Sequence, residues 1–119
     1  MKYYLLLLAT ACLVITSCFS IKSLHSTTVI KSNEAFVLGN NEHGKFYTQV
    51  TNTSPEDITI WQCPISGGKH TPIVLKTMSH AKISVDQNTA LRFENNNSVE
   101  AIIQLKVKGD LGLSMGYSN

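Results

Sequence analysis

The chain is poor in charged residues. Only 15% of its 119 residues are Asp, Glu, Lys or Arg, against roughly 25% in an average soluble chain. Ten basic and eight acidic side chains leave a net charge of +2, and they are scattered along the sequence. A domain that binds nucleic acid is therefore not expected. The 43% of apolar residues exclude a disordered chain, and the length predicts one domain.

Helical periodicity is also missing after the N-terminal region. No segment there repeats its apolar residues with a period of 3.6, and short β-type runs alternate with turns rich in Asn, Gly and Pro. This spacing predicts an all-β fold, a small antiparallel β-sandwich that is immunoglobulin-like or related, over residues 27–119. The expected strands are 27–31, 35–38, 45–51, 58–63, 72–76, 81–85, 90–93, 99–108 and 111–117.

The last expected strand has one large apolar side and one side that is almost bare backbone. Leu111, Leu113, Met115 and Tyr117 alternate with small or polar residues, among them Gly116. Glycine in a strand allows another group to approach the backbone closely. Two explanations are open: an aromatic side chain from a neighbouring strand covers the glycines, or a ligand lies on them. We expect the first.

The N-terminus lacks charge over a long stretch. Lys2 is followed by an apolar run that begins at Tyr3, and the next charged residue is Lys22. A positive start followed by about 7–15 apolar residues and then small residues is typical of a secretory signal peptide.

Ile15-Thr16-Ser17-Cys18 stands at the end of this apolar run. It resembles the lipobox of bacterial lipoproteins, an aliphatic residue and two small residues before an obligatory cysteine. The resemblance covers the first 18 residues. It implies that residues 1–17 are a signal peptide removed on export, that Cys18 is lipidated, and that residues 18–26 form a short tether.

Two other interpretations of the N-terminus are open. An uncleaved transmembrane helix would use residues 3–20, which is borderline for the roughly 20 residues that span a bilayer. An ordinary signal peptidase would cut at a site such as the one after Ala11, which leaves an apolar region of only about six residues. The lipobox interpretation fits better than either.

Cysteine is scarce. Cys12 lies in the predicted signal peptide and Cys18 carries the predicted lipid, so Cys63 alone remains in the mature chain. An intramolecular disulfide is then excluded, and the domain depends on its core for stability. We expect Cys63 to be a buried free thiol.

Catalytic and metal-binding patterns are weak. Gly112-Leu113-Ser114-Met115-Gly116 spells the nucleophile elbow of hydrolases, but that mechanism needs an acid and a histidine later in the chain, and only three residues follow. Thiol, thioether and imidazole ligands favour copper, yet the spacing of such residues does not resemble a compact copper site. These residues are Cys63, His70, Met78 and His80. We expect no enzyme activity, no metal and no cofactor.

Trp61 is the only tryptophan. On a central strand of a sandwich it would belong to the core, and otherwise it is an exposed platform for a ligand. We therefore expect a binding or structural-interaction module, held by a lipid anchor on the cell membrane or outer membrane, outside the cytoplasm. Its partner would be an envelope protein or a glycan. The alternative is a small-ligand or glycan binder that uses Trp61, and a copper-handling protein is a more distant one.

Overall fold

The structure, a computed structural model, describes residues 22–118. Nine β-strands and no helix are present in this part of the chain. The strands are β1 (Leu24–Ile30), β2 (Glu34–Leu38), β3 (Phe46–Asn52), β4 (Ile58–Pro64), β5 (His70–Leu75), β6 (His80–Val85), β7 (Thr89–Asn95), β8 (Ala101–Gly109) and β9 (Met115–Ser118). Each of the nine overlaps a range predicted from the sequence, and each extends past at least one end of that range.

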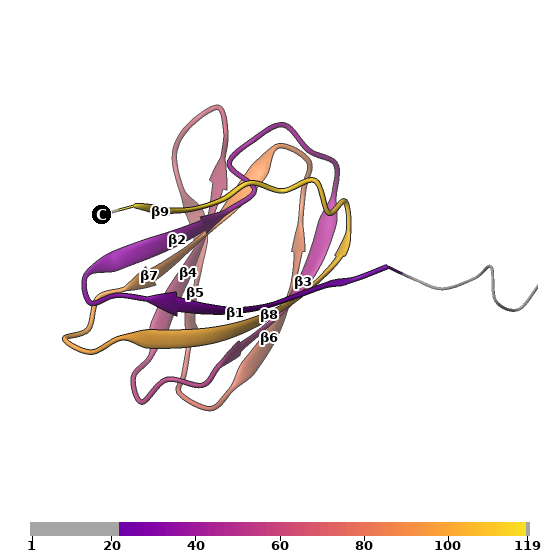
Figure 1. Cartoon of the computed structure of the whole chain (residues 1–119). Helices are drawn as coiled ribbons and strands as arrows, with labels where there is room; N and C mark the ends of the chain where they lie inside the picture. Colours follow the sequence, from indigo (N-terminus) through magenta and orange to yellow (C-terminus); the bar gives the residue numbers. More distant parts are fainter. Residues whose placement is uncertain (1–21, 119) are drawn as a thin grey trace, which may run out of the picture.

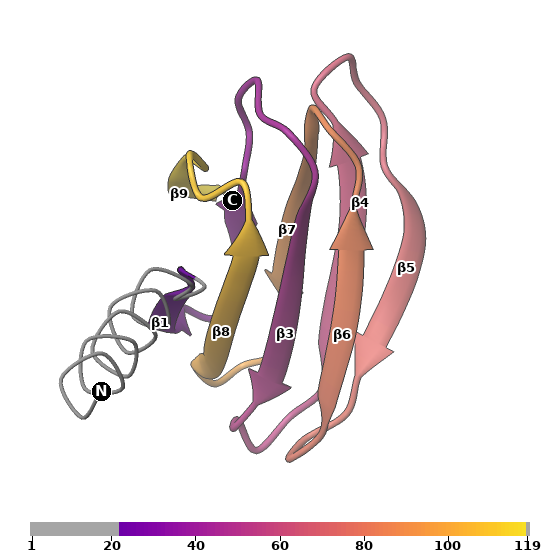
Figure 2. The same cartoon turned by 90° about the vertical axis from the view of Figure 1, so that its right-hand side faces the viewer.

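The strands form two sheets packed face to face (Figure 1). The four-stranded sheet has the order β1-β8-β3-β6 and faces the viewer in Figure 2, whereas the five-stranded sheet has the order β5-β4-β7-β2-β9. Every pairing is antiparallel. The prediction of a small antiparallel β-sandwich is confirmed. Within that class the strand order is that of a jelly roll, because β1 pairs with β8 and β2 with β7. In an immunoglobulin domain the first two strands are neighbours in one sheet.

The core lies between the inner faces of the two sheets. Strand β8 shows how the sequence produces it: Ala101, Ile103, Leu105 and Val107 are buried, while the alternate residues point outward. Phe46 and Phe93 contribute the largest buried side chains. Because the strands alternate so regularly, each sheet has a distinct outer face, and those faces carry the candidate sites.

The first strand is longer than predicted. β1 begins at Leu24 and thus includes residues 24–26, which the sequence analysis assigned to the tether. The reason is its partner: Leu24 pairs with Val107 and His25 with Lys106, so the long strand β8 provides hydrogen-bonding partners for the backbone of these residues.

The last strand is shorter than predicted. β9 begins at Met115, and Leu111 and Leu113 pack against the core from an irregular segment. The Asp110 carboxylate accepts hydrogen bonds from the backbone N–H groups of Gly44 at 2.6 Å and Gly112 at 2.8 Å. These side-chain hydrogen bonds replace the strand ladder there.

The predicted signal peptide and Cys18 lie outside the described residues. Within residues 22–118, no helix is long and apolar enough to cross a membrane.

Candidate binding face and the surroundings of Trp61

The outer face of the four-stranded sheet is basic. Three cross-strand neighbours form one row, with Tyr47 paired to Ser84 on one side and to Lys108 on the other. The next row has Gln49 between Lys82 and Lys106. We call this surface the lysine face; it consists of Tyr47, Gln49, Lys82, Ser84, Lys106 and Lys108.

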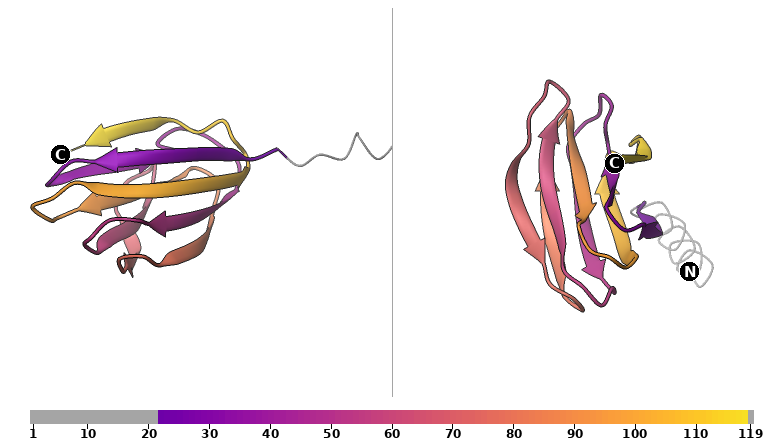
Figure 3. Two further views of the ribbon diagram at one scale, coloured as in Figure 1. Left: turned by 60° about the horizontal axis from the view of Figure 1, so that its bottom comes forward. Right: turned by 90° about the vertical axis from the view of Figure 1, so that its left-hand side faces the viewer.

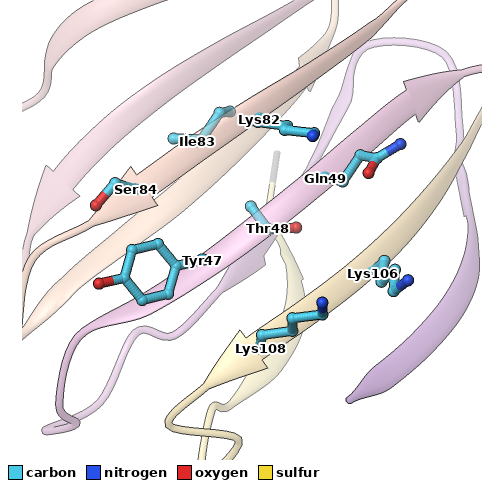
Figure 4. Close-up of a pocket in the computed structure, with 8 residues that line it drawn as sticks. All are labelled: Tyr47, Thr48, Gln49, Lys82, Ile83, Ser84, Lys106 and Lys108. Carbon is cyan, nitrogen blue, oxygen red and sulfur yellow. The ribbon is translucent and has the colours of Figure 1, made fainter. Parts of the chain in front are cut away.

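These side chains line an open groove of about 350 Å³ (Figure 4). Tyr47 is 51% exposed, and its ring lies at one end of the labelled cluster. The groove floor is formed by the strands themselves, with Thr48 and Ile83 facing inward between the outward residues. A rigid floor holds the outward side chains at fixed spacing.

The lysine face holds no ion pair, because the salt bridges of the described residues involve Lys69, Arg92 and Glu94. Strands β1, β3, β6 and β8 place no Asp or Glu on this outer face within the described residues. The Lys45 ammonium lies 5.5 Å from the centre of the Tyr47 ring and adds a fourth cation at the margin. Unpaired ammonium groups around an exposed aromatic ring can bind an anion that also has a flat or apolar surface.

Trp61 lies on the opposite side of the molecule, on the outer face of the five-stranded sheet. Ile58 and Ile60 of β4 point into the core, so Trp61 points outward and is half-buried. The expectation that Trp61 belongs to the core is wrong. Its indole Nε1–H donates to Glu94 Oε1 at 2.5 Å, and the Lys69 ammonium lies 4.5 Å from the ring centre. One ring face is therefore already covered by a lysine.

Glu94 connects this cluster. Its other oxygen accepts Arg92 Nε–H at 3.0 Å and lies 3.7 Å from Lys69 Nζ. Partial burial alone would raise the pKa of Glu94, but the hydrogen bonds from Arg92 and Trp61 and the neighbouring positive charges outweigh it and lower the pKa below 4.5. Glu94 is therefore ionised at neutral pH, and it holds Trp61 and Arg92 in place.

Cys63 is a free thiol and is half-buried, so the prediction that it is buried is wrong. It follows Trp61 on the outward side of β4, where Ala90 is its cross-strand neighbour. Burial raises the pKa of its thiol above the ordinary 9.0 although Arg92 and Lys69 oppose the shift. His70, Met78 and His80 are exposed. Among residues 22–118, no three His, Cys, Asp or Glu side chains gather closely enough to hold a metal ion.

The lysine face cannot be recognised from the sequence alone. Its residues come from three strands that are distant in the sequence, and only the pairing of β3 with β6 and β8 brings them together. The available signal was the alternation inside each strand, which marks Lys82, Lys106 and Lys108 as outward residues of their own strands.

Comparison with known proteins gives the fold and no family. No protein-family model matches the chain, and a search of curated proteins finds no match either. Among solved structures, the capsular polysaccharide assembling protein CapF from Staphylococcus aureus is similar, with a TM-score of 0.56 and 11% identity over 74% of this chain. A second structure of CapF, with the inhibitor 3-isopropenyl-tropolone, gives the same values. The chain spans about a quarter of the CapF chain. At this identity the similarity establishes a β-rich fold alone.

Proposed function

We propose that the protein is a lipid-anchored binding module of the bacterial cell envelope, and that it binds an acidic polysaccharide across the lysine face. The observation that carries this proposal is the grouping of Lys82, Lys106 and Lys108 around the exposed ring of Tyr47, with no carboxylate on the same outer face of the described strands.

The chemistry of the face matches an acidic sugar polymer. Ammonium groups pair with carboxylate or sulfate groups, the Tyr47 ring stacks on the apolar face of a sugar, and the Gln49 amide and Ser84 hydroxyl exchange hydrogen bonds with sugar hydroxyls. A solvent-exposed lysine contributes only about 0.2–1 kcal/mol per ion pair. Binding therefore depends on several contacts made at once by a repeating ligand, as an extended polymer provides.

Trp61 serves this function less well than Tyr47. Its N–H group is used by Glu94 and one ring face is covered by Lys69. The sequence also suggested a glycan binder that uses an exposed aromatic residue, Trp61. We propose Tyr47 in its place.

Binding to immobilised polygalacturonate, with neutral dextran as the reference polymer, tests the proposal. We expect the full chain, purified in a non-ionic detergent, to bind polygalacturonate only, and binding to weaken with salt. The double variant Lys82→Gln/Lys106→Gln should weaken binding by about five- to tenfold, from the loss of two ion pairs. Tyr47→Ala should weaken it by about threefold or more, from the loss of stacking.

The matched control is Lys31→Gln/Lys76→Gln, which removes the same charge from exposed positions outside the lysine face. It should bind within twofold of the unmodified protein. Equal losses in the two double variants, or full binding by Tyr47→Ala, would show a general ion-exchange effect and refute the assignment of this face.

The anchor has its own test. In cells supplied with labelled palmitate, Cys18→Ala should abolish labelling and leave the precursor uncut, because this thiol is the attachment point that the lipobox offers. Two or three acyl chains hold a protein on a membrane, whereas one gives only marginal, reversible binding. Equal labelling of the unmodified protein and of Cys18→Ala would refute the lipoprotein assignment and leave the glycan test unaffected.

A further inference from the structure

The outer face of the five-stranded sheet contains a second groove, separate from the lysine face. One cross-strand row crosses it from β4 to β9, with Trp61 paired to Arg92, Arg92 to Val37, and Val37 to Gly116. In Figure 3 the strands of this sheet run side by side, with β9 at one edge. The side chains in this row become smaller from Trp61 to Gly116, so the backbone of β9 is left uncovered at Gly116.

Gly116 is uncovered. A Cβ atom built on it would meet no heavy atom within 4 Å, so the expectation that an aromatic side chain covers this glycine is wrong. Its φ lies outside the left-handed region, and the backbone conformation alone does not demand glycine there. The missing side chain leaves room above the sheet, in an open groove of about 360 Å³.

The groove combines an apolar floor with one cation. Val37, Pro64 and Met115 line it together with Gly116. Its polar members are Arg92, Asn40, Ser114 and Ser118, and Cys63 and Tyr117 also line the groove. Arg92 is held by its Nε–H bond to Glu94, and its two terminal amino groups have no protein acceptor in the described part of the chain. A guanidinium fixed in this way presents a fork that fits the two oxygens of a carboxylate.

The charges around the groove favour a ligand that carries a single negative charge. Glu94, the carboxylate nearest to Arg92, is already bound by Trp61 and Arg92 and lies near Lys69. No Asp or Glu is among the residues that line the groove. We propose that this groove binds an organic monocarboxylate with an apolar body, whose carboxylate pairs with Arg92 and whose body lies over Val37 and Gly116.

The proposal is tested by ¹H–¹⁵N NMR titration of the full chain in detergent micelles. The probes are hexanoate, hexanol, which has a similar body without the charge, and hexylammonium, which has the opposite charge. We expect only hexanoate to give saturable shifts at the amides of Val37 and Gly116. Arg92→Ala should weaken hexanoate binding by about tenfold or more, as expected when a charged hydrogen-bonding partner is lost.

Two further variants separate a binding role from a structural one. Arg92→Lys keeps the charge but loses the fork, and should weaken hexanoate binding several-fold. Gly116→Leu fills open space, so the sandwich should keep its spectrum while hexanoate binding disappears. Lys69→Ala is the control, because Lys69 contacts Glu94 but does not line the groove; it should bind within twofold. Equal shifts with hexanol, or unchanged hexanoate binding in Arg92→Ala or Gly116→Leu, would overturn the proposal.

Discussion

Glu94 illustrates how one side chain organises a surface. It accepts hydrogen bonds from Trp61 and Arg92, which come from neighbouring strands, and it draws Lys69 towards the indole ring. Arg92 is two residues before Glu94 on β7, so alternation places both on one face, whereas the contact with Trp61 depends on the register between β4 and β7 and cannot be recognised from sequence spacing. The direction of Trp61 could be predicted from strand alternation with Ile58 and Ile60, but the preference of tryptophan for cores pointed the other way.

The fluorescence of Trp61 should report the ionisation of Glu94. Its folded-state pKa lies below 4.5, so the stability gained from the ionised carboxylate is present above pH 4.5 and is lost as the pH falls through the folded pKa. We expect an acid transition in Trp61 emission with a midpoint below pH 4.5. Glu94→Gln should remove the transition. A midpoint above 4.5 in the unmodified protein would contradict the lowered pKa.

Thr48 is a weak point of the core. Its side chain is 3% exposed, and its hydroxyl oxygen has no hydrogen-bond partner in the described part of the chain. An unsatisfied buried hydroxyl costs about 1–3 kcal/mol. Thr48→Val should therefore raise the free energy of unfolding by about 1 kcal/mol, measured by urea denaturation. Thr51→Val, a half-exposed position on the same strand, is the control and should change it by less than about 0.5 kcal/mol.

Turns between strands depend on buried asparagines. Asn52, at the end of β3, is fully buried; its Nδ2–H groups donate to the carbonyls of Glu56 and Leu75, and its Oδ1 accepts the Ser54 N–H. Asn95, at the end of β7, ties the turn after β1 to the turn before β8 in the same way. The sequence marks these residues as turn formers, but it does not show that their amides replace missing backbone partners inside the protein.

Removal of the Asn52 amide should destabilise the fold. Asn52→Ala leaves the Leu75 carbonyl and the Ser54 N–H without their partners in a buried place. We expect the free energy of unfolding to fall by about 2–4 kcal/mol, measured by thermal and urea unfolding. Asn96→Ala, an exposed asparagine of the neighbouring turn, should be nearly neutral. Equal effects at the two positions would contradict this account of the turn.

The presence of a strand could be predicted from the sequence more readily than the residue at which the strand ends. Alternation of apolar residues marks β8 along most of its length, because every second residue faces the core. The ends depend on partners elsewhere in the chain. Gly109 closes β8 with a φ of 94°, and a Cβ there would lie 2.9 Å from the Lys45 carbonyl oxygen. This close approach of two chain segments has no counterpart in the local sequence.

The jelly-roll order joins segments from opposite ends of the chain. β1 pairs with β8 and β2 with β7, so both pairings join residues that are far apart in the sequence. Folds dominated by such non-local pairing fold in about milliseconds to seconds. We expect refolding, followed by the emission of Trp61 in stopped flow, to occur on that timescale. Microsecond refolding would contradict the predominance of non-local contacts.

The position of β1 determines how far the lysine face can lie from a lipid anchor. His25 pairs with Lys106, so the chain enters the four-stranded sheet beside the lysine face itself. Five residues, 19–23, separate the lipobox cysteine from β1, and the six Cα–Cα steps from Cys18 to Leu24 reach at most about 20 Å. With the proposed lipid on Cys18, this connection would set the greatest distance between β1 and the membrane. A polysaccharide bound on the lysine face would be kept within a few nanometres of the membrane, at a distance that the length of this connection sets.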